Sequence, residues 1–428
     1  MQRYVYDTVK ETLYYEKLNN GLDVYVLPKP GFQKTYATFA TRYGSIDNHF
    51  QVEGGKEIRV PDGIAHFLEH KMFEEPEGDI FSTFASQGAS ANAFTSFDRT
   101  VYLFSATEHI AENLTTLLNF VQNPYFTDAN VEKEKGIISQ EIKMYQDHPD
   151  WRSYYGLIEA MYKEHPVRID IAGTVSSISQ ITKETLYECY RTFYHPSNMM
   201  LFVVGGVDPE EVFALVRENQ EGKKFESQGA VRRFYPQEPS GVAMRKKVAH
   251  LPVSLPKCLF GFKEPVSGLE GRKLLELELS TKLMLDILYG QSSDYYQSLY
   301  DEHLISDQFG YDFQCNRDYA FSMIGGETKD PELLLSRVET QLNEMLEKGI
   351  GEADFERCKR KRIGGFLRML NSPEAIANQF SNYQFKGCNL FDILPVYESL
   401  TLDQVNNRLH EHVKWEQFAI SIVTSDPA

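Results

Sequence analysis

The pattern of apolar and polar positions predicts that the chain opens as a β-sheet and continues as alternating strands and helices. Asn20-Gly21 is a typical hairpin turn between two strand-like segments. Further strands are predicted at 34–44, 90–94, 99–106 and 199–205, and helices at 63–73, 79–87, 109–122, 127–144, 182–192 and 209–219. This mixture predicts an α+β domain in the first half of the chain.

The second half repeats part of this order. A strand predicted at 317–325 precedes a helix at 331–348, as the strand at 99–106 precedes the helix at 109–122. The two strands begin 218 residues apart, which is about half of the 428 residues. This repeat indicates a duplicated domain.

The segment between the two halves reads as a linker. Residues 219–247 are polar and contain proline and glycine, as exposed linkers do. We therefore expect a first domain at 1–222, a linker at 223–246 and a homologous second domain at 247–428.

Composition and charge exclude some classes of partner. A hydrophobic fraction of 42% and a charged fraction of 25% are typical of folded globular proteins. The 61 acidic residues outnumber the 44 basic residues, and the net charge of −17 would repel nucleic-acid phosphates and anionic lipids. We expect no nucleic-acid partner. The acidic surplus could favour cationic peptides, but a surplus spread over the solvated surface explains the charge as well.

The sequence shows no signal for export or membrane insertion. The first residues lack the apolar segment of a signal peptide. The longest apolar run, 199–207, is well short of the roughly 20 residues that span a bilayer. The five cysteines form no C-x-x-C pair, which suits a reducing compartment. We expect a cytoplasmic protein without a membrane span.

The candidate chemistry lies in the motif His66-Phe67-Leu68-Glu69-His70. His66 and His70 are four residues apart, so that they face the same side of a helix. Glu69 lies beside the second histidine, within reach of a water at a metal bound there. A lone helical histidine is usually a packed core residue, but the H-x-x-E-H order is the inverzincin signature. The motif therefore predicts a zinc site with its own general base. Since 247–428 contains no H-x-x-E-H, we expect 1–222 to be the zinc-binding catalytic domain and 247–428 a homologous domain without zinc.

A third ligand is expected because catalytic zinc usually takes three protein ligands and leaves one position for water. The predicted helix at 127–144 offers Glu132, Glu134 and Glu141. Glu134 and Glu141 are two helical turns apart and face the same direction. Spacing alone leaves open which of the three acids binds zinc. It also leaves open that these acids only pair with neighbouring lysines.

With these acids about seventy residues after the histidines, the sequence resembles the pitrilysin and mitochondrial-processing-peptidase family of inverted zinc proteases. The resemblance covers nearly the whole chain and includes Asn92-Ala93, His165-Pro166-Val167-Arg168 and the segment 194–199. It implies that Glu141 is the third zinc ligand and that Glu134 supports the ligands from behind. It also implies one zinc ion per chain.

The resemblance further implies two homologous α+β domains, each a mostly antiparallel sheet packed with helices. This is the architecture of processing peptidases and LuxS-like metallohydrolases. The implied function is a zinc endopeptidase that cuts peptides or small unfolded polypeptides in a chamber formed with a partner subunit. Glu69 would activate the attacking water. We also expect Ser90, Ala91, Asn92 and Ala93 to bind an extended peptide by edge addition.

One feature of the family is missing. Its second domain carries an Arg and a Tyr, seven residues apart, that hold the substrate backbone near the zinc. The matching stretch here has Tyr300 and Asp307 at these places. We therefore expect a heterodimer with a related subunit that carries the Arg/Tyr pair, with a homodimer as the alternative. A second possible function is a zinc-containing but weakly active assembly or regulatory subunit of a processing complex.

Overall fold

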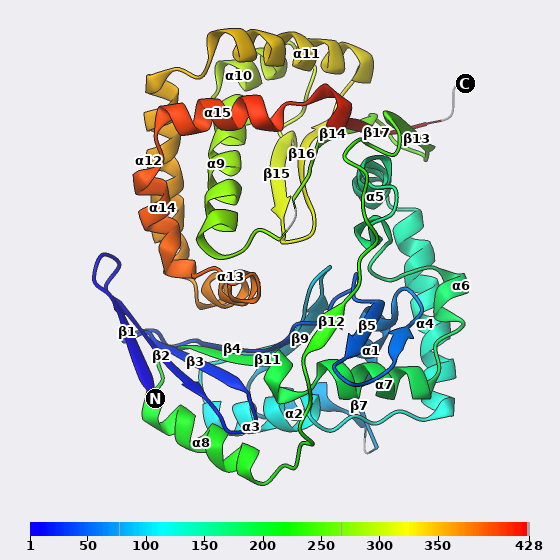
Figure 1. Cartoon of the computed structure of the whole chain (residues 1–428), viewed down its shortest axis with the longest axis vertical. Helices are drawn as coiled ribbons and strands as arrows, with labels where there is room; N and C mark the ends of the chain where they lie inside the picture. The colour runs from blue at the N-terminus through cyan, green and yellow to red at the C-terminus, as the bar shows by residue number, and fades with distance from the viewer. Residues whose placement is uncertain (77, 267, 426–428) are drawn as a thin grey trace. The chain divides into compact units, whose positions relative to one another are not determined.

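The computed structural model describes residues 1–76, 78–266 and 268–425 and contains two compact units, both of α+β class (Figure 1). The first unit comprises Met1–Ile142, Ile169–Tyr235 and Met369–Phe385, and the second Lys143–Arg168, Pro236–Arg368 and Lys386–Ala428. The predicted two-part α+β fold is confirmed. Each unit also contains one segment from the opposite half of the chain. The boundaries at 222 and 247 stay a prediction about the duplication.

The first unit is built on a seven-stranded sheet. Its order is β1 (Gln2–Tyr6), β2 (Glu11–Lys17), β3 (Asp23–Pro28), β11 (Met199–Gly205), β4 (Thr35–Thr41), β10 (Thr100–Ala106) and β9 (Ser90–Thr95). Strands β3 and β11 run parallel, and all other neighbours are antiparallel. The predicted hairpin joins β2 and β3, where Gly21 takes a left-handed conformation with φ 93°.

Helices cover both faces of this sheet, and Figure 1 shows α13 on the face opposite to α3 and α8. The helices are α1 (Ile64–Met72), α2 (Ile80–Ser86), α3 (Ile110–Val121), α4 (Asp128–Gln146), α6 (Val175–Ile178), α7 (Lys183–Phe193), α8 (Pro209–Glu221) and α13 (Pro373–Phe385). Phe39, Tyr102 and Leu201 of the sheet pack with Leu117 of α3 in the core. All six predicted helices are present, and side-chain caps at Thr182 and Asp208 start α7 and α8.

Two smaller sheets complete the first unit. Strands β12 (Val231–Arg233), β5 (His49–Val52) and β6 (Glu57–Arg59) form one, and β7 (Glu74–Glu75) pairs with β8 (Gly78–Asp79) in the other. Strand β12 lies inside the predicted linker, which is therefore not irregular throughout.

The second unit repeats the sheet order of the first. Its strands are β13 (Lys246–His250), β17 (Phe418–Thr424), β14 (Lys257–Glu264), β16 (Ala320–Glu327) and β15 (Gly310–Cys315). Strands β13 and β17 are parallel and the other neighbours antiparallel, as in β3-β11-β4-β10-β9. The outer strand pairs even share a register, since β9 and β15 each align six residues with their partner. This repeat is the structural counterpart of the sequence echo.

The helices of the second unit are α5 (Pro149–Met161), α9 (Gly271–Tyr289), α10 (Asp294–Asp301), α11 (Pro331–Lys348), α12 (Glu352–Met369), α14 (Ile393–Ser399) and α15 (Leu402–His412). Short 3-10 turns lie at Pro166–Arg168, Leu390–Asp392 and Trp415–Gln417 in this unit, and at Pro196–Asn198 in the first unit. Helix α5 packs on β17, β14 and β13, although it directly follows α4 in the chain. Neither α5 nor α13 is among the predicted elements.

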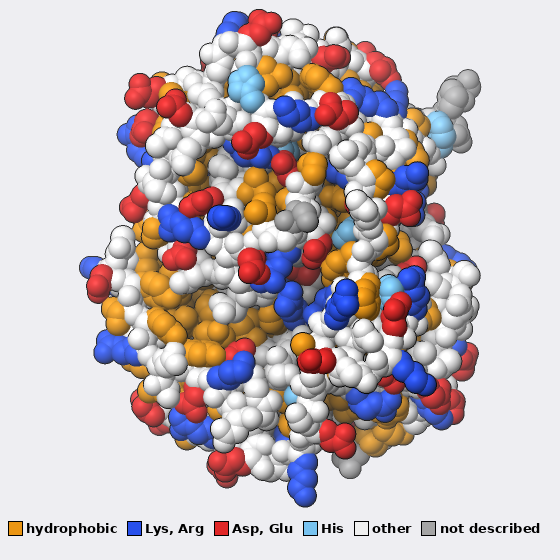
Figure 2. Space-filling view, in the orientation of Figure 1, with side chains coloured by type: hydrophobic (Ala, Val, Ile, Leu, Met, Phe, Trp, Pro, Cys, Tyr) orange, Lys and Arg blue, Asp and Glu red, His pale blue; other side chains and the backbone are white. Residues whose placement is uncertain are grey.

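The surface agrees with the simpler explanation of the net charge. On the face seen in Figure 2, acidic side chains are interspersed with basic ones. None of the helices in the described ranges is long and apolar enough to cross a membrane.

Candidate metal centre

Helix α1 carries the H-x-x-E-H motif and is fixed by its own core face. Phe67 and Leu68 are fully buried in the core of the first unit. The helix begins after Gly63, which has φ 87°; a Cβ there would lie 2.4 Å from the carbonyl oxygen of Ala172. Only glycine fits this start without strain. The backbone and the core residues together orient the two histidines.

The structure brings His66, His70 and Glu141 together. Nε2 of His66 lies 3.7 Å from Oε1 of Glu141, and Nε2 of His70 lies 3.6 Å from Oε2 of the same carboxylate. Within the described ranges, these three residues form the one group of His, Cys, Asp or Glu side chains that could hold a metal ion. A tetrahedral zinc with ligand bonds near 2.1 Å separates its ligands by about 3.4 Å. The spacing and the donor types therefore fit zinc.

Glu134 lies behind His70. Its Oε1 is 3.1 Å from Nδ1 of His70, and since a carboxylate accepts, the imidazole donates from Nδ1. This leaves the lone pair of Nε2 free for a metal. Burial raises the pKa of Glu134, but the hydrogen bond from His70 and the charge of Lys71 outweigh it and lower the pKa. Glu132, the open alternative, is exposed and pairs with Lys135.

The two histidines differ in their electrostatics. Burial, with a smaller effect of His70, lowers the pKa of His66 to about 3, which keeps it in the neutral form that binds metals. Burial also lowers the pKa of His70, but its bond to Glu134 and the charges of Glu69 and Glu141 outweigh this and raise it. The carboxylates therefore favour a cation at this place, which a proton or a metal ion can supply.

Glu69 faces the same centre and has a partner that the sequence analysis missed. Thr95, the last residue of β9, donates from Oγ1 to Oε2 of Glu69 over 2.7 Å. Burial raises the pKa of Glu69, the bond from Thr95 opposes this, and the net direction is upward. A carboxylate with a raised pKa suits a group that takes and returns a proton near neutral pH. Hydroxyl residues are common in strands, so that the sequence held no signal for Thr95.

The predicted peptide-binding residues lie on an edge strand. Strand β9 pairs with β10 on one side, and no strand in the described ranges pairs with its other side. The backbone N–H of Ala93 is bonded to the side chain of Asn92, over 2.9 Å, instead of to a strand. Ser90 and Asn92 are exposed and Ala91 and Ala93 half-buried. Through Thr95, the same strand reaches Glu69.

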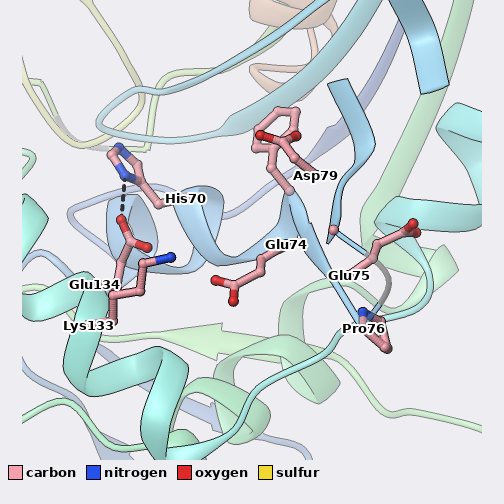
Figure 3. A pocket seen from close by; sticks show the side chains of 9 residues that line it. His70, Glu74, Glu75, Pro76, Asp79, Lys133 and Glu134 are labelled. Carbon is pink, nitrogen blue, oxygen red and sulfur yellow. Dashed lines mark hydrogen bonds and ion pairs between the residues drawn. The ribbon is translucent and has the colours of Figure 1, made fainter. Parts of the chain in front are cut away.

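A pocket of about 620 Å³ opens beside His70 and Glu134 (Figure 3). Helix α4 contributes Lys133 and Glu134 to its wall, and the β7–β8 hairpin contributes Glu74, Glu75 and Asp79. The sequence analysis did not predict this pocket, because its wall combines segments about sixty residues apart.

In the second unit, Tyr300 and Asp307 lie on α10 and on the segment that leads from α10 into β15. Tyr300 lies at the end of α10 and is 44% exposed, and Asp307 is exposed before β15. Tyr300 stands at the place expected for the guanidinium and Asp307 at the place expected for the phenol, so that neither residue carries the group expected at its own position.

Comparison with known families agrees with the geometry. Residues 55–175, which hold all the clustered residues, match the family model described as "Insulinase (Peptidase family M16)". Residues 180–362 match the model described as "Peptidase M16 inactive domain". The two matches divide the chain into a half with the motif and a half without it.

Relatives cover nearly the whole chain. "Uncharacterized zinc protease YmfH" of Bacillus subtilis (strain 168) is 53% identical over 416 residues, 97% of each chain. The crystal structure of an M16-like peptidase from Alicyclobacillus acidocaldarius superposes with a TM-score of 0.94 at 44% identity, over 97% of this chain and 99% of that one. The periplasmic protease PqqL from Escherichia coli, 18% identical, shares the fold with a TM-score of 0.75. It covers 96% of this chain, which spans only 47% of PqqL.

Proposed function

Since this chain belongs to the insulinase (M16) family of zinc proteases, we propose that it is a zinc-dependent endopeptidase acting on peptides or small unfolded polypeptides. The observation that carries the proposal is the convergence of two imidazole nitrogens and one carboxylate, within 4.8 Å of one another, beside the buried acid Glu69.

His66, His70 and Glu141 would hold one zinc ion per chain, with Glu134 fixing the imidazole of His70. When bound, zinc supplies a Lewis acid that polarises the scissile carbonyl and makes a water molecule more acidic. The Nδ1 bond of His70 leaves the lone pair of its Nε2 free for the metal. The low pKa of His66 keeps that imidazole neutral, and its Nε2 faces Glu141.

Glu69 would be the general base and then the general acid. Thr95 holds the carboxylate through Oε2, and the carboxylate would accept the proton of the attacking water. The carboxyl group would then return this proton to the nitrogen of the leaving amine. Its raised pKa supports the second step, because burial favours the protonated form of the carboxyl group.

Strand β9 would align the substrate. An extended peptide that pairs with its free edge would run past Thr95 toward Glu69, with Ser90, Ala91, Asn92 and Ala93 in contact with it. The side chain of Asn92 bonds the N–H of Ala93. The peptide would therefore displace this side chain or accept its amide as a further partner.

The active form would include a partner subunit that closes the chamber. Tyr300 and Asp307 stand where the family has the Arg/Tyr pair, so that this chain would depend on a related subunit for those contacts. The greater length of PqqL, of which this chain spans 47%, supports pairing of two such halves. A homodimer is the alternative partner arrangement.

We also propose that the protein works in a reducing compartment such as the cytoplasm. All five cysteines are free and buried, as is usual in reducing compartments.

The test is a comparison of the wild-type chain with Glu69→Gln on a library of quenched fluorescent peptides, with the native partner present. We expect both proteins to bind one zinc and only the wild type to cut peptides. Retained hydrolysis in Glu69→Gln would rule out the proposed base. A zinc-loaded wild type without hydrolysis in the assembled complex would favour the assembly or regulatory function instead.

A further inference from the structure

Lys71 is a charged residue in the core. It directly follows His70, the second histidine of the motif. Lys71 lies on the same face of α1 as Phe67, four residues earlier. Its side chain is fully buried. Burying an unpaired ammonium group is costly, so that buried lysines are paired with acids. The acidic partners of Lys71 therefore indicate which part of the protein its charge stabilises.

The two partners of Lys71 lie on either side of it. Nζ pairs with Glu74 of β7 and lies 3.8 Å from Oε2 of Glu134 on α4. The other oxygen of Glu134, Oε1, is the one that accepts from His70. Two consecutive residues of α1 thus hold the two oxygens of one carboxylate.

This arrangement fixes the orientation of Glu134 and, through it, that of His70. A carboxylate held at one oxygen can turn about its last side-chain bond, whereas one held at both oxygens cannot. In Figure 3 the Glu134 carboxylate points at the His70 ring along the bond between them. Groups behind a metal-binding histidine set its tautomer and ring position, and through them metal affinity.

The charges agree with this arrangement. Glu69, Glu134 and Glu141 bring three carboxyl groups to one centre, two of them buried. Lys133 is adjacent to Glu134 in sequence and lines the pocket, but it is exposed. Lys71 instead places its positive charge inside the protein and in contact with Glu134.

We propose that Lys71 is a positioning residue of the metal centre, which locks Glu134 so that His70 presents Nε2 to zinc. The inference rests on the zinc site of the proposed function, but not on peptide hydrolysis. Lysine at a core position of the motif helix is otherwise unexplained, because an apolar side chain would pack there at lower cost.

The test is a double-mutant cycle on zinc affinity, measured by competition with a chelating dye. Lys71→Met removes the charge and keeps the length of the side chain, and Glu134→Gln removes the carboxylate. We expect Lys71→Met to weaken zinc binding about tenfold in the wild-type background and by no more than about twofold in the Glu134→Gln background. An equal loss in both backgrounds, or no loss in either, would overturn the proposal.

Matched variants separate positioning from packing. Lys133→Met removes the exposed lysine beside Glu134 and should leave zinc affinity within about twofold of wild type. Lys71→Arg keeps a cation and should restore most of the affinity lost in Lys71→Met. A tenfold loss in Lys133→Met, or no rescue by arginine, would count against a specific role of Lys71.

Zinc affinity and peptide hydrolysis are independent measurements on these variants. If Lys71→Met does not fold, as judged by circular dichroism, Lys71→Gln replaces it in the same cycle with the same two outcomes. A chain that binds zinc but hydrolyses nothing would leave these affinities unchanged, so that the proposed function could fail alone. Equal losses in both backgrounds with normal hydrolysis would remove Lys71 from the metal centre and leave the peptidase intact.

Discussion

Thr95 Oγ1 donates a hydrogen bond of 2.7 Å to Oε2 of Glu69, which ties the end of the edge strand to the candidate base. This bond stabilises the ionised form of Glu69 and lowers its pKa, against the larger effect of burial. Glu69 must be ionised to accept a proton, so that activity should fall as the pH drops through its raised pKa.

Thr95→Val should therefore move the acid limb of the kcat/KM profile to higher pH. The loss of one hydrogen bond to a charged group predicts a shift of about one pH unit, with zinc content unchanged. Thr95→Ser keeps the hydroxyl and should retain the wild-type limb. A limb that moves to lower pH in the valine variant would contradict the assignment of Glu69.

The choice of the third ligand is tested by two acids of α4. Glu141→Ala should weaken zinc binding at least about a hundredfold, because one of three protein ligands is lost. Glu132→Ala should bind zinc as the wild type does, since this exposed side chain pairs with Lys135. The number of zinc ions per chain, determined for both variants after dialysis against a weak chelator, measures these effects. An intact zinc content in Glu141→Ala would assign the site to other residues.

The start of the motif helix should tolerate no side chain. Gly63→Ala combines a left-handed backbone with a Cβ placed 2.4 Å from the carbonyl oxygen of Ala172. We expect it to reduce the free energy of unfolding by about 3 kcal/mol. Gly31 has φ +85° but nothing within 4 Å of its Cβ position, so that Gly31→Ala should cost about 1 kcal/mol. Urea titration measures the free energy of unfolding of both variants. Equal losses would show that the close contact at Gly63 does not constrain the start of α1.

The missing Arg/Tyr pair can be introduced into this chain by substitution. Both positions are exposed, so that the double variant Tyr300→Arg, Asp307→Tyr should fold. If the lack of the pair limits the isolated chain, the double variant should hydrolyse peptides about tenfold faster than wild type, and the single variants should gain little. Full activity of the unmodified chain without a partner, equal to that of the double variant, would exclude the need for complementation.

Periodicity predicted the elements that have one clear face. The predicted helix at 63–73, the strand at 199–205 and the helix at 331–348 agree with α1, β11 and α11 to within a residue or two. Local signals at Asn20-Gly21 and Thr182 also sufficed, because a turn or a cap depends on near neighbours only.

The remaining features depend on distant parts of the chain. The local sequences of α5 and α13 do not indicate which sheet each helix packs on. Thr95 contacts Glu69 because the end of β9 lies beside α1. Lys71 contacts Glu134 because α4 packs near α1 in the folded chain. Helix periodicity predicts an apolar residue at position 71, where the chain has a lysine. Such conflicts between local pattern and tertiary contact are expected at functional sites.

The central claim is most directly tested by anomalous scattering at the zinc absorption edge, from crystals of the full-length chain grown with zinc. We predict one strong peak per chain, bonded to Nε2 of His66, Nε2 of His70 and the carboxylate of Glu141 at about 2.0 to 2.2 Å. An empty site, or a zinc ion held elsewhere while these three side chains point apart, would contradict the account.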